Sequence, residues 1–131
     1  MFKRFLLALV SIFAAWTAID LLLHRFVLGS LYSSTPELWR PASELNFPLI
    51  YGVVVVLIAS FFLLFELLVS PKTLVSGLKF GALLGVAIGL SVGFGTYIHM
   101  PVPFGLAWGW FLGGWVKALV AGAILGALPR P

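Results

Sequence analysis

The chain has 131 residues, of which 62% are apolar and 9% are charged. Soluble domains contain about 45–50% apolar and about 25% charged residues, so this chain has too few polar side chains to cover a water-soluble fold. It contains no cysteine, which excludes disulfides, thiolate metal sites and cysteine nucleophiles. Its net charge of +4 comes from scattered basic residues without a basic stripe or a binding module, so we expect no nucleic-acid partner.

Four segments have the length and apolarity of membrane-spanning helices, which need about 20 mostly apolar residues. They lie at approximately residues 5–26, 47–69, 74–98 and 103–128. The first begins after Lys3 and Arg4 and is too long for a typical signal peptide, so we interpret it as an uncleaved span. The sequence predicts an all-α membrane protein in a lipid bilayer: a single integral domain over residues 1–131, folded as an up-down-up-down four-transmembrane-helix bundle.

The connections predict the orientation of the spans. Proline-containing breaks at 70–73 and 99–103 are short, whereas residues 27–46 form a longer loop. Basic residues near the span ends collect on one side, namely Lys3, Arg4, Lys72, Lys79 and Arg130, against only Arg25 and Arg40 on the other. Because cytoplasmic loops are enriched in Lys and Arg, we expect both termini in the cytoplasm and the longer loop outside an inner membrane.

Glycines at a spacing of four residues form the strongest pattern in the chain. The third span carries Gly77, Gly81, Gly85, Gly89 and Gly93, and the fourth carries Gly105, Gly109 and Gly113, with a neighbouring row of Gly114, Ala118, Gly122 and Gly126. Residues four apart share a helix face, and faces without side chains let helix backbones approach closely in lipid. Either the third and fourth spans pack together through this glycine zipper, or one face docks a second copy or a partner subunit.

Two groups of polar residues are expected at membrane depth, where ionisable side chains are costly. The outer group is Asp20, His24 and His99, which could bind a divalent metal, relay protons, or only hold the first span to the third. The inner group of buried charges is Glu66, Lys79 and Lys117. We expect Glu66 to pair with Lys79 and Lys117 to extend toward the cytoplasm; the alternative is a charged cytoplasmic vestibule for an anion.

Several short runs resemble a group of small four-span bacterial inner-membrane proteins of uncharacterised function. They are Asp20–His24, Leu31–Tyr32, Glu37–Pro41, Gly77–Gly81 and Gly93–Tyr97. The resemblance covers most of the chain and implies a bacterial membrane protein, without an activity, substrate or catalytic residue.

The sequence leaves two functional hypotheses. The glycine faces and short loops favour a non-catalytic structural or accessory subunit of a membrane complex or homo-oligomer. The polar groups favour a small transporter, or an ion- or metal-handling protein with an outer Asp/His site. No nucleophile elbow and no phosphate-binding loop occurs in the sequence, so an enzymatic role is disfavoured and no catalytic residue is predicted.

Overall fold

The computed structural model describes residues 1–130, which form helices and connecting turns without a strand. The long helices are α1 (Phe2–Leu21), α3 (Phe47–Leu68), α4 (Leu74–His99) and α5 (Phe104–Ala127). A π-helical segment (Leu22–Val27) continues α1, and the connection to α3 holds α2 (Gly29–Ser33) and two short 3-10 turns (Pro36–Leu38 and Ala42–Glu44). The all-helical prediction is confirmed, and four helices are long and apolar enough to cross a membrane.

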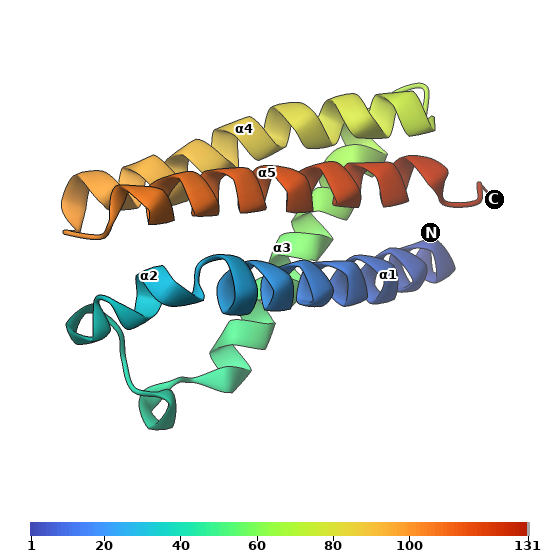
Figure 1. Ribbon diagram of the computed structural model, residues 1–131. Coiled ribbons are helices and arrows are strands. Elements are labelled where there is room, and N and C mark those ends of the chain that lie inside the picture. Colours follow the sequence, from blue (N-terminus) through green and yellow to red (C-terminus); the bar gives the residue numbers. More distant parts are fainter. Residues whose placement is uncertain (131) are drawn as a thin grey trace.

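The helices form one hairpin with two further helices beside it. Helices α4 and α5 lie side by side over their whole length, α1 lies alongside α5, and α3 is steeply inclined behind α1 (Figure 1). The marked N and C ends lie at the same end of the molecule, together with the connection between α3 and α4 (Figure 1). The longer connection from α1 to α3 lies at the opposite end (Figure 1).

The glycine row of α4 faces α5. All five of its glycines are buried, and a Cβ added to Gly77 or Gly81 would overlap a backbone carbonyl oxygen of α5. The residues opposite are also small, because Gly122 meets Gly77 and Ala118 meets Gly81. The two backbones touch there because neither helix carries a bulky side chain at these positions. Farther along the row, Gly85 and Gly89 leave room for the side chains of Trp115 and Phe111 of α5.

The second glycine row lies on a different face of α5, toward the first span and α2. Each glycine there accommodates one leucine: Gly105 contacts Leu31, Gly109 contacts Leu28 and Gly113 contacts Leu23. Both rows are therefore occupied by other parts of the same chain. Neither row is left open for a second copy in this structure.

Aromatic contacts join α1 to α3. The rings of Trp16 and Phe61 lie 5.6 Å apart in an edge-to-face arrangement, and those of Phe5 and Phe62 lie 5.3 Å apart in a similar one. Edge-to-face pairs are favourable beyond the area that they bury. They set the face of α1 that turns toward α3 and leave Asp20, farther along the helix, between α3 and α5.

Arg4 joins three helices at the end of the molecule where the termini lie. Its Nε donates to Oε1 of Glu66 at 2.8 Å, and its remaining nitrogens donate to the carbonyl oxygens of Leu125, Leu128 and Pro129 at 3.2, 2.9 and 2.8 Å. The last carbonyls of a helix lack intrahelical partners and form the negative end of its dipole, so a buried cation is well placed there. Arg4 thus ties α1 to both α3 and the end of α5.

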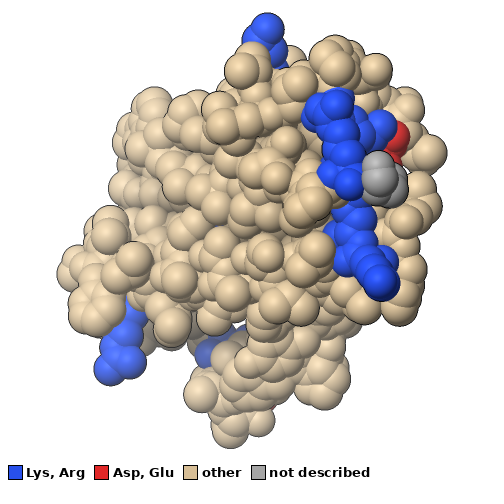
Figure 2. All heavy atoms as spheres, turned by 90° about the vertical axis from the view of Figure 1, so that its right-hand side faces the viewer, with Lys and Arg blue, Asp and Glu red and all other residues tan. Residues whose placement is uncertain are grey.

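The prediction that Glu66 pairs with Lys79 is wrong. Glu66 turns toward α1, where Arg4 offers a nearly buried guanidinium, while Lys79 lies on an exposed face of α4. Lys79 is therefore not one of the buried charges. Figure 2, which looks onto the end with the termini, shows a mostly tan surface with blue Lys and Arg atoms at several separate places and a few red acidic atoms beside one of them.

Candidate functional site

An ion pair between two of the long helices forms the centre of the candidate site. Nζ of Lys117, on α5, lies 2.9 Å from Oδ2 and 3.0 Å from Oδ1 of Asp20, on α1. The side chains are 23% and 36% exposed, so the pair is half-covered by protein although both residues belong to spanning helices. Lys117 does not extend toward the end with the termini, which is the predicted cytoplasmic end, because its ammonium turns to the carboxylate of Asp20 on the part of α1 nearer the longer connection.

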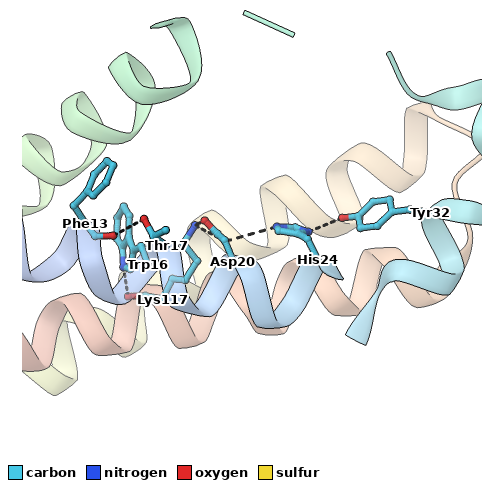
Figure 3. Close-up of polar contacts among 7 residues, drawn as sticks. All are labelled: Phe13, Trp16, Thr17, Asp20, His24, Tyr32 and Lys117. Atoms are coloured by element: carbon cyan, nitrogen blue, oxygen red, sulfur yellow. Dashed lines mark hydrogen bonds and ion pairs between the residues drawn. The ribbon is translucent and has the colours of Figure 1, made fainter. Parts of the chain in front are cut away.

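Trp16, one turn before Asp20 on α1, also contacts Lys117. Its indole N–H donates to the backbone oxygen of Lys117 at 2.8 Å, and its ring centroid lies 5.1 Å from the Lys117 ammonium. A cation over an indole face is attracted by the ring quadrupole. Because Trp16, Asp20 and His24 follow at intervals of four residues, these three lie along one face of α1 and its π-helical continuation (Figure 3).

A chain of polar groups leads from Asp20 toward the longer connection. His24 Nε2 lies 3.6 Å from Oδ1 of Asp20, and His24 Nδ1 lies 2.7 Å from the hydroxyl of Tyr32, on α2 (Figure 3). The indole N–H of Trp110, on α5, donates to the same hydroxyl at 2.6 Å. The chain therefore runs from Lys117 through three side chains to the aromatic residues beneath the connection.

The hydrogen bonds assign the direction of this chain. Trp110 can only donate, so the Tyr32 oxygen accepts from it and has its own hydrogen free for Nδ1 of His24. Neutral His24 then carries its hydrogen on Nε2, which faces Asp20. Burial raises the pKa of the Tyr32 hydroxyl, the hydrogen bond from Trp110 opposes the rise, and the Asp20 carboxylate adds to it. Tyr32 consequently keeps its hydrogen at neutral pH.

The backbone is irregular where this chain leaves α1. Residues Leu22–Val27 are π-helical, and the amide of Leu28 donates to the carbonyl of Leu23 at 2.8 Å, five residues back. Single π-helical turns within α-helices occur frequently at functional sites. The segment includes His24, one member of the polar chain.

A pocket lies beside the ion pair, between α1, α3, α4 and α5. We call it the ion-pair pocket; its volume is about 190 Å³ and its polar side is formed by Asp20, His24 and Lys117. Its other walls are apolar or aromatic and include Phe61 and Trp110. An apolar cavity with a few convergent polar groups is the usual form of a small-molecule site.

The predicted outer group of three is not assembled. Asp20 and His24 are neighbours, but His99 lies exposed at the end of α4, beside a groove formed by Ser91, Thr96 and other residues of that helix end. In residues 1–130 no three His, Asp or Glu side chains are close enough to hold a metal ion. Asp20, His24 and His99 therefore do not meet, and the alternative of a joint metal site has no support in this part of the chain. His24 borders the ion-pair pocket together with Val92 of α4, which lies about two helical turns before His99, so the two histidines are also offset along the bundle.

Sequence reasoning missed three members of the site. Trp16 was detectable, because it precedes Asp20 by four residues and so shares its helix face. Tyr32 and Trp110 were not, because their approach to His24 depends on how the chain turns after Val27 and on which face of α5 meets α1.

The fold and the site together define a membrane-integral helical protein with an ion pair between two of its spanning helices. No family model, curated protein or solved structure matches this chain.

Proposed function

We propose that the protein is a small membrane carrier that couples the movement of a small solute to the binding and release of a proton at Asp20. The observation that carries this proposal is the Lys117–Asp20 pair, half-covered and next to a pocket. Ionisable pairs within membrane spans are costly and are typical of ion, proton and solute pathways. Well-packed apolar residues would hold the helices together at least as well.

The helical rise supports a position of the pair inside the hydrocarbon. At 1.5 Å per residue, Arg4 and Arg25 lie about 31 Å apart along the first span, close to the thickness of a bilayer core of about 30 Å. Asp20 then lies about 7 Å inside the boundary at Arg25, and Lys117 lies near the middle of its span. A carboxylate at that depth with 36% of its side chain exposed requires water, a ligand or a second protein surface beside it.

The proposed arrangement in the membrane is an up-down-up-down bundle with both termini in the cytoplasm of a bacterial cell and the connection after Val27 outside. The excess of basic residues near the termini supports it, as does the common end of the N- and C-termini in Figure 1. In this orientation the chain of polar groups through His24 and Tyr32 leads to the outer surface.

The chemistry of the cycle follows from the polar chain. Asp20 alternates between a carboxylate paired with Lys117 and a neutral acid. When Asp20 takes a proton from Nε2 of His24, Nδ1 of His24 accepts the hydrogen of Tyr32, which regains one from outer water. The 3.6 Å separation of His24 and Asp20 is longer than a hydrogen bond, so transfer requires a closer approach or one intervening water.

Reconstitution into liposomes tests the proposal. An inward gradient of a mixture of small organic anions, cations and neutral solutes should change the pH inside vesicles that contain the wild-type protein. The change should disappear in Asp20→Asn, return in Asp20→Glu, and persist in Glu44→Gln, which alters an exposed carboxylate of the longer connection. An equal pH change with Asp20→Asn would refute the proposal.

A second proposal, an accessory subunit or a homo-oligomer, has support from one observation. Ser91, Thr96 and His99 border an exposed groove on the outer part of α4, where polar groups in lipid favour a partner. The partner would contact this groove and not the glycine rows. Native mass spectrometry from lipid should then detect an oligomer that Ser91→Leu dissociates, and a monomer alone would exclude a homo-oligomer.

A further inference from the structure

The size of the ion-pair pocket limits what it can bind. An apolar cavity of about 150 Å³ is known to hold benzene, and the ion-pair pocket has about 190 Å³. It therefore has room for an apolar body of about one aromatic ring together with one small polar group. The walls formed by Trp16, Phe61 and Trp110 fit such a body, and the polar group must lie near Asp20 and Lys117.

Charge balance links the binding of a charged ligand to the movement of a proton. The empty pocket is neutral, because Lys117 and Asp20 compensate each other. An isolated charge is very costly in an apolar site. A cation that took Asp20 would therefore require Lys117 to release a proton, and an anion that took Lys117 would require Asp20 to bind one.

The neighbouring groups favour an anion. Arg25 lines the adjoining hollow on the α1–α3 side together with Asp20 and His24, so the surplus charge around the pocket is positive. The Lys117 ammonium lies 5.1 Å from the centroid of the Trp16 ring, which favours a cation at this wall of the pocket. The polar chain through His24 offers Asp20 a proton.

We propose that the ion-pair pocket binds a small monoanion with an apolar body of about one ring, and that Asp20 takes up one proton as the anion replaces it at Lys117. This inference rests on the proposed carrier function and names its class of solute. Net charge in the pocket is the same before and after binding, because the anion and the proton enter together.

Few titratable or charged groups surround Asp20, so a pH dependence of binding can be assigned to its carboxyl. His24 and Arg25 lie on the same span, Lys117 comes from α5, and Tyr32 acts through His24. On the α3 side the titratable neighbour is Tyr51, in the adjoining hollow. The residues that α4 contributes to the pocket are Ile88, Gly89 and Val92, which do not titrate.

Three permanently charged or uncharged probes of similar shape test the inference: benzenesulfonate, phenyltrimethylammonium and methyl phenyl sulfone. Since none of them titrates, any pH dependence of binding comes from the protein. Binding to the full chain in phosphatidylcholine nanodiscs is measured by calorimetry and by quenching of tryptophan fluorescence. We expect benzenesulfonate to bind best of the three, and its binding should be accompanied by the uptake of one proton. Its affinity should therefore fall about tenfold for each unit by which the pH is raised above neutral.

Two variants separate the charge from the fold. Lys117→Gln should abolish benzenesulfonate binding, and Asp20→Asn should bind it without pH dependence or proton uptake, because an amide is neutral at every pH. Lys79→Gln removes an exposed lysine of α4 and should bind as the wild type does. The midpoint of thermal unfolding of each variant shows whether a loss of binding reflects a loss of folding. Should Lys117→Gln unfold, Asp20→Asn still decides through its pH profile.

The outcomes distinguish this inference from the carrier function. Preferential binding of phenyltrimethylammonium would overturn the proposal that the ligand is an anion, but it would leave the proposal of a proton-coupled site. If no probe binds but protons still move in liposomes in a way that depends on Asp20, only the proposed size and charge of the ligand are overturned. Binding of benzenesulfonate that ignores both pH and Lys117→Gln would also overturn the inference. Absence of both binding and proton movement would remove both proposals.

Discussion

Substituting alanine for Gly81 should destabilise the hairpin of α4 and α5. The added Cβ would overlap the carbonyl oxygen of Ala118 and lie 2.9 Å from Cα of Leu119. These atoms are backbone, so no side-chain rotation relieves the contact and the helices must separate. Overpacking of this kind costs about 1–3 kcal/mol. It outweighs the gain of about 0.5–1 kcal/mol that alanine gives over glycine in a helix.

Gly52 provides the matched control, because it lies within α3 and an added Cβ there meets no atom within 4 Å. Gly52→Ala should therefore keep only the gain in helix propensity and stabilise the protein. Because this gain is common to both variants, they should differ by the overpacking cost of about 1–3 kcal/mol. Equilibrium unfolding in mixed dodecylmaltoside and sodium dodecyl sulfate micelles, followed by circular dichroism, measures both. A Gly81→Ala variant at least as stable as the wild type would refute the packing argument.

Two further predictions concern the ends of the helices. Arg4→Met should lower the free energy of unfolding by about 3–5 kcal/mol, because it leaves Glu66 without a partner at a buried site. Lys79→Met, which replaces an exposed lysine, should change the free energy of unfolding little. Equal effects of the two substitutions would contradict the role of Arg4. Burial raises the pKa of Tyr32, so above about pH 10 the unfolded chain loses this proton first and stability falls as the pH rises. Tyr32→Phe should lack this part of the fall, and identical pH profiles for the two proteins would contradict the assignment.

The long helices were predictable because the cost of unpaired backbone groups in lipid leaves few alternatives to a helix. The predicted span 74–98 and the observed α4, Leu74–His99, differ by one residue. The start of α4 carries a local signal, since the side chain of Thr73 accepts from the amide of Ser76 as an N-cap. The glycine spacing similarly indicated which face of α4 could approach another helix.

Which charged residues form ion pairs with each other was not predictable in the same way. Arg4 and Glu66 are 62 residues apart, and Asp20 and Lys117 are 97 apart. Which of them meet depends on the rotation of each helix about its axis, and many rotations satisfy an almost uniformly apolar sequence. His99 illustrates the same point, since its place at the end of its helix was predictable and its separation from His24 was not.

The protonation of Asp20 is the central claim, and the sequence allows it to be measured alone. Of the four acidic residues three are glutamates, so Asp20 is the one aspartate in the chain. Protein labelled with ¹³C at the aspartate carboxyl therefore gives one side-chain carboxyl signal by nuclear magnetic resonance in lipid bilayers. We predict that this signal moves from the carboxylate to the acid position when benzenesulfonate is added at a constant, near-neutral pH, and that it returns when the probe is removed. A signal that stays at the carboxylate position with the probe bound would contradict the account.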